Sequence, residues 1–322
     1  MRKEIDMEIV KEKWSSTVST VTLGATSEEG GTRSYRIMAG GMSSLPFLSF
    51  EGIIPCRPAF ALEVLDRVPE NYPEALRRVY GDALQNPGKW AEMCVKKFGA
   101  ELISLRLLST HPDEGDTGPE EAVKAVRSVL DSTGAPLIII GSGITEKDNL
   151  VMPAVSVEAR GEACLLGTAV QENYRTIVSS ALENGHSVIA ESPIDINIAK
   201  QLNIMMHEMG LPLERIVMYP TTGALGYGLE YAYSIMERSR IAALSGDGIL
   251  GVPMICYAGA ESWKVKESRT ENPCWGDHVQ RGVAWEVNTA GAFLHAGSDI
   301  LILYHPEALS VVKRMALSLI QA

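Results

Sequence analysis

Short apolar runs alternate with longer amphipathic stretches along the chain from residue 61 onward. Each run is rich in Ile, Leu or Val and ends at small or polar residues. This is typical of strands buried on both faces of a parallel sheet. The predicted strands are Ala61–Leu65, Leu102–Leu108, Pro136–Ile140, Ala163–Leu166, Ser187–Ala190, Arg215–Met218, Pro253–Tyr257 and Ile300–Tyr304.

The stretches between these runs carry apolar residues at helical spacing. The stripe of Ile198, Leu202, Met205-Met206 and Met209 is one example, and core packing explains it better than a partner groove. A glycine follows several of the predicted helices, where a left-handed cap residue is favoured. The predicted cap glycines are Gly134, Gly185, Gly210 and Gly297.

Eight strands that are each followed by a helix predict a (β/α)₈ TIM barrel over residues 61–322. That length is close to the roughly 250 residues typical of the fold. A doubly wound open sheet is the alternative. It is disfavoured because its first strand normally leads to a glycine-rich phosphate turn, whereas here the first strand leads to Asp66-Arg-Val-Pro-Glu.

The first 60 residues have a different pattern. Val18–Leu23 and Ser34–Met38 are two β-rich runs joined by a polar, glycine-containing loop, which predicts a β-hairpin with a longer connection. We therefore expect residues 1–60 to form an extension that packs on the barrel or on a partner.

The chain of 322 residues is 46% apolar and 21% charged, as in globular proteins. Its formal net charge of −11 argues against a nucleic-acid binder, which needs a basic surface to meet phosphates. No apolar stretch approaches the roughly 20 residues that span a bilayer, and the amino terminus does not resemble a secretory signal. We expect a cytoplasmic protein with no membrane contact.

Five cysteines are spread along the chain without any C-x-x-C pair. A disulfide scaffold and a self-contained zinc or iron–sulfur site are therefore poorly supported. Cys164 and Cys256 lie in apolar runs, where a thiol usually packs as a small core residue.

In a barrel of this kind the carboxyl ends of the strands form the working face. Glu63 and Glu191 lie there and could form a hydrolytic carboxylate pair, although aromatic sugar platforms are scarce. Gly141-Ser-Gly143 is a weak phosphate-loop candidate, and His305 is better explained as a capping or packing residue than as a general base. No strand contains a lysine for Schiff-base chemistry, and no His, Asp and Glu cluster has metal-ligand spacing.

The segment Tyr219–Tyr231 places hydroxyls and glycines at the end of the sixth predicted strand. An ordinary glycine-rich turn is one explanation, and a rim for docking a large flat ligand is the other. The residues alone therefore predict a barrel with a ligand-docking rim and few catalytic groups.

Several long segments in this order resemble the small (delta) subunit of the corrinoid/iron–sulfur protein of the anaerobic acetyl-CoA (Wood–Ljungdahl) pathway. They are Trp90–Gly99, Leu107–Pro112, Gly141–Asp148, Asp195–Asn203, Pro220–Tyr231, Ala260–Lys266, Trp275–Asp277 and His305–Ala308. The likeness covers nearly the whole barrel. Tyr219, where many relatives are expected to have an acidic residue, and Val170–Asn173 depart from the family pattern.

The resemblance implies a methyl-carrier subunit, without catalytic residues or metal ligands of its own, that covers a corrinoid (cobamide) shared with a larger subunit. The [4Fe–4S] cluster belongs to the larger subunit. A methyltetrahydrofolate-dependent methyltransferase supplies the methyl group, and acetyl-CoA synthase/CO dehydrogenase receives it. The corrinoid-binding pattern D-x-H-x-x-G is absent, because Asp277 is followed directly by His278.

The predicted corrinoid contacts combine glycines, which let the backbone approach a flat ring, with hydroxyl and amide groups that can bond the amides of a corrin rim. They are Ser142, Asn197, Thr221, Thr222, Gly223, Ala224 and Tyr227. The competing hypothesis is a pterin-dependent methyltransferase with the same barrel. It is disfavoured because such barrels hold the pterin with Asp and Asn at several strand ends. A small-molecule hydrolase that uses Glu63 and Glu191 is a third possibility.

Overall fold

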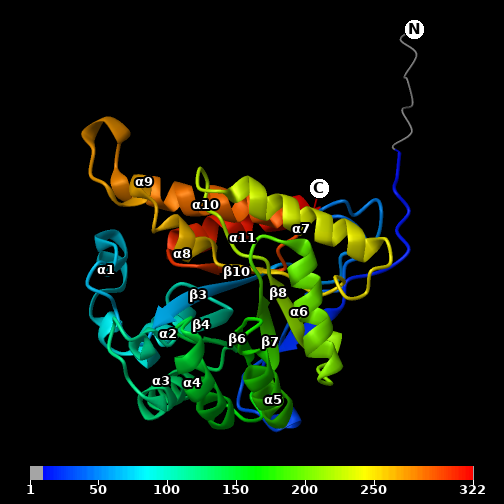
Figure 1. Cartoon of the computed structure of the whole chain (residues 1–322). Coiled ribbons are helices and arrows are strands. Elements are labelled where there is room, and N and C mark those ends of the chain that lie inside the picture. Colours follow the sequence, from blue (N-terminus) through cyan, green and yellow to red (C-terminus); the bar gives the residue numbers. More distant parts are fainter. Residues whose placement is uncertain (1–9, 322) are drawn as a thin grey trace.

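The computed structural model describes residues 10–321 and is built around a ring of parallel strands surrounded by helices (Figure 1). The strands are β3 (Ala59–Leu65), β4 (Leu102–Arg106), β5 (Leu137–Ile140), β6 (Leu165–Ala169), β7 (Ser187–Glu191), β8 (Ile216–Tyr219), β9 (Ile255–Cys256) and β10 (Ile300–Leu303). They hydrogen-bond in the order β8-β7-β6-β5-β4-β3-β10-β9. A parallel bridge between Met218 and Met254 joins the two ends of the sheet, and the Met218 N–H donates to the Pro253 carbonyl at 2.8 Å.

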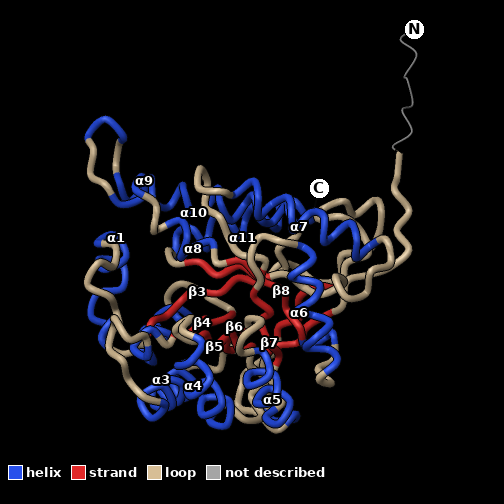
Figure 2. Tube along the Cα trace, viewed as in Figure 1, coloured by secondary structure: helices blue, strands red, loops and turns tan. Residues whose placement is uncertain are grey.

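The helices form the outer layer around the strands (Figure 2). They are α1 (Glu74–Tyr80), α2 (Pro87–Lys96), α3 (Pro119–Ser132), α4 (Thr145–Glu158), α5 (Tyr174–Asn184), α6 (Ile196–Glu208), α7 (Leu229–Leu244), α8 (Ala258–Ser262), α9 (Lys266–Arg269), α10 (His278–Ala296) and α11 (Pro306–Gln321). Their buried faces pack on the outward side chains of the strands in one continuous core. The predicted (β/α)₈ barrel is confirmed, and the open-sheet alternative is wrong.

The strand predicted over Leu102–Leu108 is too long. It ends at Arg106, and a 3₁₀ turn, η3 (Leu108–Thr110), follows it. The carboxylate of Asp66 draws this turn across the end of β3, because it accepts hydrogen bonds from both the N–H and the hydroxyl of Ser109 at 2.9 and 2.5 Å.

Three of the four predicted cap glycines adopt the left-handed conformation. Gly185, Gly210 and Gly297 have φ angles of 86°, 95° and 102°. The prediction for Gly134 is wrong, because α3 ends at Ser132 and Thr133 already has an extended backbone. A side chain at Gly134 would collide with Ser34, so this glycine permits close packing of the amino-terminal extension.

The predicted hairpin is confirmed as β1 (Thr20–Leu23) and β2 (Ile37–Gly40), which pair antiparallel. Val21 and Leu23 alternate with more exposed residues and belong to the apolar cluster inside the barrel. That cluster contains the first residues of several strands, including Leu102 and Ile300. The hairpin therefore covers the amino-terminal end of the barrel and leaves the carboxyl end open.

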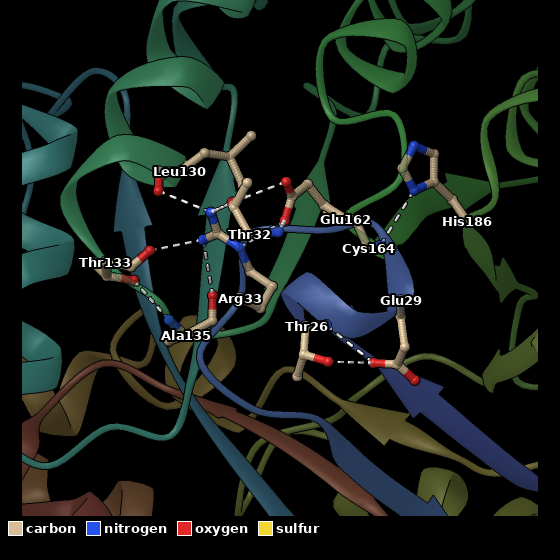
Figure 3. A network of polar contacts seen from close by, with 10 residues as sticks. All are labelled: Thr26, Glu29, Thr32, Arg33, Leu130, Thr133, Ala135, Glu162, Cys164 and His186. Carbon is tan, nitrogen blue, oxygen red and sulfur yellow. Dashed lines mark hydrogen bonds and ion pairs between the residues drawn. The ribbon is translucent and has the colours of Figure 1, made fainter.

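Arg33 fastens this extension to the barrel (Figure 3). Its guanidinium is paired with the carboxylate of Glu162 at 2.8 Å, and both side chains are buried. It also donates to the carbonyls of Leu130, Thr133 and Ala135 at 2.9, 2.7 and 3.3 Å, around the end of α3. These carbonyls lack helical partners, so the arginine caps the helix as well as closing the ion pair.

No helix within residues 10–321 combines the length and the apolar character that crossing a bilayer requires.

Candidate functional site

One polar and aromatic layer faces the inside of the barrel at the carboxyl ends of the strands. Apolar residues occupy the inward positions below it, as Ala61 does before Glu63 and Val217 before Tyr219. Alternate residues of a strand point to the same face. The residue two positions after the last inward apolar side chain therefore also points inward, and it belongs to this layer. Its members are Glu63, Arg106, Glu191, Tyr219, Tyr257 and Tyr304. We call this set the mouth layer.

A salt bridge between Arg106 and Glu63 occupies one side of the mouth layer. The guanidinium donates to both carboxylate oxygens, from Nε at 2.8 Å and from Nη2 at 3.3 Å. The Tyr304 hydroxyl adds a third bond to Glu63 at 3.0 Å. Burial by itself lowers the pKa of Arg106, but the Glu63 carboxylate outweighs burial and raises that pKa above its ordinary value. The guanidinium is therefore charged, and its nearest partner within the chain is the Glu63 carboxylate.

Two stacked tyrosines form the other side of the layer. The rings of Tyr219 and Tyr257 lie 4.2 Å apart at 27°, and the Arg106 guanidinium lies 5.3 Å from the centre of the Tyr257 ring. Burial raises the pKa of Tyr219, Tyr257 and Tyr304 above the ordinary value of a phenol. These hydroxyls are neutral at physiological pH, so the layer presents aromatic faces and neutral donors.

A cavity of about 410 Å³ opens above the mouth layer. On one side its wall comes from the β3–α1 connection, with Pro69 and Asn71, and on another from the α8–α9 segment, with Trp263 and Lys264. The backbone carbonyl of Asn71 accepts a hydrogen bond from Arg269, which links these two walls. Neither a histidine nor a cysteine lines this cavity.

The predicted contact Ser142 lines the cavity, and its loop is held by Asp148. That carboxylate accepts from the Ser142 N–H at 2.8 Å, the Ser142 hydroxyl at 2.9 Å and the Gly143 N–H at 3.0 Å. Burial raises the pKa of Asp148, and these hydrogen bonds oppose the increase. The donors that would cradle a phosphate are thus occupied by a side chain of α4, which removes the weak phosphate-loop hypothesis.

The predicted contacts Thr221 and Thr222 join neighbouring strand ends. The Thr221 hydroxyl donates to the Ser192 carbonyl at 2.7 Å, and the Thr222 oxygen accepts from the Tyr257 N–H at 3.0 Å. Neither caps the following helix, since α7 begins at Leu229 and Gly228 precedes it in a left-handed conformation.

The other predicted contacts differ in exposure. Gly223 and Ala224 are buried, whereas Tyr227 is 53% exposed and its hydroxyl donates to Glu267 at 2.9 Å. Asn197 lies in the first turn of α6 with an exposed side chain. Ligand contact by any of these residues stays a prediction.

Glu63 is not free to act in a hydrolytic pair with Glu191. Its side chain is completely buried and held by Arg106, whereas the Glu191 carboxylate makes no hydrogen bond or ion pair with the part of the chain that the structure describes. The interpretation of His305 as a capping or packing residue is confirmed, because its Nδ1 accepts from the Glu307 N–H at 3.2 Å and its ring stacks on Trp263. Cys164 and Cys256 are core residues, as predicted.

Sequence reasoning identified Glu63 and Glu191 but missed Arg106, Tyr257 and Tyr304 as site residues. The two-residue period of each strand could have identified them, because the side chain two positions beyond the last inward apolar residue also points into the barrel. Among residues 10–321 no group of three or more His, Cys, Asp or Glu side chains is arranged to hold a metal ion.

The family model for the CO dehydrogenase/acetyl-CoA synthase delta subunit matches residues 20–320 of the chain. A relative named acetyl-CoA decarbonylase/synthase complex subunit delta, from Archaeoglobus fulgidus, is 40% identical over 95% of this chain and 69% of its own length. Proteins of the same name from Methanosarcina mazei and Methanocaldococcus jannaschii are 38% and 34% identical, over 95% and 98% of this chain and 72% and 77% of their own lengths.

Among solved structures the chain resembles dihydropteroate synthases. The enzyme from Xanthomonas albilineans matches with a TM-score of 0.57 at 13% identity, over 86% of this chain and 98% of that one. The enzyme from Vibrio fischeri matches with a TM-score of 0.58 at 14% identity, over 84% and 96% of the two chains. At such identities the likeness concerns the barrel fold alone.

Proposed function

The chain belongs to the CO dehydrogenase/acetyl-CoA synthase delta-subunit family, and from this premise we propose that it is the small subunit of a corrinoid/iron–sulfur methyl carrier. Its barrel mouth covers a corrinoid that it shares with a larger subunit, which also holds the [4Fe–4S] cluster. The methyl group arrives from methyltetrahydrofolate through a methyltransferase and leaves to acetyl-CoA synthase/CO dehydrogenase.

The observation that carries this proposal is the chemistry of the mouth layer. Its tyrosines are neutral and its arginine is already paired with Glu63, so the floor of the cavity suits a neutral, flat ligand. A phosphate or a carboxylate would find no uncompensated cation in this layer. Glu191 adds one free carboxylate, which accepts hydrogen bonds from amide N–H groups.

The residues around the mouth fit a corrinoid as a cover. Ser142 brings a hydroxyl to the cavity wall, Thr221 brings one to the neighbouring strand ends, and Tyr227 and Asn197 have exposed side chains that a ligand could reach. With neither imidazole nor thiolate lining the cavity, the chain offers no cobalt ligand there. When bound, the corrinoid supplies the cobalt that accepts and donates the methyl group. The barrel contributes a floor of aromatic faces and neutral hydroxyls that shields that face from bulk water.

Metal content tests the proposal directly. The chain produced together with its larger partner should yield a complex with the visible absorption of a corrinoid and stoichiometric cobalt and iron. The chain produced alone should contain no iron and retain little or no corrinoid. Absorption spectra and elemental analysis of both preparations distinguish the outcomes. Stoichiometric iron in the isolated chain, or a complex without cobalt, contradicts the proposal.

A further inference from the structure

A second cavity, of about 390 Å³, lies beside the mouth layer and shares Glu191 with the first. It is bounded by the β6–α5 connection, the end of β7 and one face of α6. Its α6 wall is apolar and consists of Ile198, Leu202 and Met205, with Pro193 beside it. We call it the α6 cavity. It explains why Ile198, placed at a core position of the predicted stripe, is 39% exposed.

Ser192 supplies a polar group in this cavity that has no partner in the described part of the chain. The residue is 1% exposed, and its hydroxyl makes no hydrogen bond. Its backbone is fully used, because the N–H donates to the Tyr219 carbonyl at 3.0 Å and its own carbonyl accepts from Thr221. Buried hydroxyls are mostly paired, so this unpaired one on a cavity wall is available to a partner from outside the chain.

Thr221 completes the wall in a conformation that its residue type disfavours. It lines the α6 cavity with a φ angle of 63°, in the left-handed region that a β-branched residue seldom adopts. Its hydroxyl bond to Ser192 holds it there. Backbone strain of this kind gathers at ligand sites, where the surrounding structure maintains it.

The charges of the α6 cavity select the class of ligand. Glu172 and Glu191 are the ionisable residues of its lining, which contains no Lys, Arg or His. A buried anion would be repelled there, whereas a group that donates hydrogen bonds would be attracted. The apolar α6 wall adds a preference for an aliphatic stem.

We propose that the α6 cavity receives a primary-amide side arm of the corrin ring that covers the mouth. The amide N–H donates to Glu191, the amide carbonyl accepts from the Ser192 hydroxyl, and the aliphatic stem packs on Leu202 and Met205. This inference rests on the proposed function, because it assigns one peripheral group of the same ligand to a place beside the mouth.

The test uses the complex with the larger subunit, freed of corrinoid, and dicyanocobinamide as the probe. This corrinoid carries the primary amides but lacks the nucleotide arm. Ser192→Ala should raise the dissociation constant roughly tenfold, as expected for one lost hydrogen bond. Met205→Trp, which fills the cavity, should raise it at least as much. Ser239→Ala removes an equally buried, unpaired hydroxyl from α7, away from both cavities, and should leave the dissociation constant unchanged.

Thermal unfolding separates ligand binding from a structural role. Removal of an unpaired buried hydroxyl should keep or raise the midpoint of the Ser192→Ala complex, although its affinity falls. A corrinoid whose amides are replaced by methyl esters lacks the N–H that donates to Glu191, so wild type should bind it less tightly than dicyanocobinamide.

Three results overturn the inference. If Ser192→Ala binds dicyanocobinamide as tightly as wild type, the α6 cavity does not hold the amide while the proposed function stands. If Ser192→Ala weakens subunit association with corrinoid affinity unchanged, the cavity accepts an Asn or Gln of the partner. If wild type binds no corrinoid, the inference and the proposed function both fail.

Discussion

Glu286 is a completely buried carboxylate behind the mouth that binds N–H groups and forms no ion pair within residues 10–321. It accepts from the Trp263 indole at 2.7 Å and from the backbone of Tyr304 and His305 at 2.5 and 3.2 Å. Burial raises its pKa from 4.5 to about 7, although these hydrogen bonds oppose the increase. Trp263 and Tyr304 line the mouth cavity, so the protonation state of Glu286 affects the hydrogen bonds that hold these two residues in the cavity wall.

The raised pKa of Glu286 predicts a pH-dependent stability. At a pH between the unfolded and folded pKa values of Glu286, the folded state holds a proton that the unfolded state has lost. The contribution of Glu286 to the free energy of unfolding is therefore complete below about pH 4.5 and is lost as the pH rises through about 7. Glu286→Gln should flatten this dependence by up to about 3 kcal/mol. Urea unfolding of the isolated chain between pH 5 and 8 measures it.

Glu230→Gln, on the exposed start of α7, is the matched control and should keep the wild-type slope. An unchanged slope in Glu286→Gln would show that this carboxylate titrates at the same pH in the folded and unfolded chain.

Thr221 and Thr222 allow a second prediction at the residue scale. The double change to Val should weaken corrinoid retention by roughly one to two factors of ten. It should also destabilise the barrel by about 1–3 kcal/mol, because the Tyr257 N–H loses its acceptor. Corrinoid content and thermal midpoint of the heteromeric complex are the two measurements. The double change to Ser keeps both hydroxyls and should retain the corrinoid. Loss of stability with unchanged corrinoid content would assign these hydroxyls to the barrel alone.

At the scale of elements, the amino-terminal hairpin and the barrel depend on each other. The hairpin supplies Val21 and Leu23 to the interior cluster, and Arg33 links it to Glu162 and to the end of α3. A buried ion pair contributes little compared with apolar packing, but removal of one partner leaves an uncompensated charge.

Arg33→Met should therefore destabilise the chain by about 3–5 kcal/mol. Arg33→Met combined with Glu162→Gln should recover part of this loss, because the buried charge is gone. Urea unfolding midpoints report both changes. Arg36→Met breaks the exposed pair with Glu29 and should change stability by less than about 1 kcal/mol. Equal effects of Arg33→Met and Arg36→Met would contradict a structural role for the buried pair.

At the scale of the whole molecule, this chain shares a barrel fold with dihydropteroate synthases at 13% identity. The hypothesis of a pterin-dependent methyltransferase expects Asp and Asn side chains at several strand ends. Here Glu63 is paired with Arg106 and Asp148 is held by Ser142 and Gly143, so Glu191 is the one unengaged carboxylate among Glu63, Asp148 and Glu191. A shared fold therefore does not carry over the ligand.

We expect the isolated chain to show no saturable binding of methyltetrahydrofolate, because these engaged carboxylates cannot pair with a pterin ring. Isothermal titration calorimetry up to millimolar ligand measures this, with the methyltransferase as the positive control. Saturable binding accompanied by methyl transfer would restore the pterin-dependent methyltransferase as the better explanation.

The barrel follows from local signals in the sequence. Strand and helix periodicity depend on neighbours a few residues apart, so short Ile-, Leu- and Val-rich runs with amphipathic stretches between them were sufficient to predict the strands and the hairpin. The family resemblance was likewise readable from contiguous segments, and the comparisons confirm it.

Tertiary structure decided the mouth. Arg106 on β4 binds Glu63 on the neighbouring strand β3, and Tyr304, which follows β10, binds the same carboxylate. Tyr219 ends β8 and Tyr257 follows β9, the two edge strands of the hydrogen-bonding order, and their rings stack where the barrel closes. Such contacts depend on barrel closure and strand register, which join residues far apart in sequence. Gly134 is a further case: the local pattern predicts a helix cap there, whereas its role is set by Ser34 on another segment. Local patterns determine which elements form, whereas closure determines which side chains share a site.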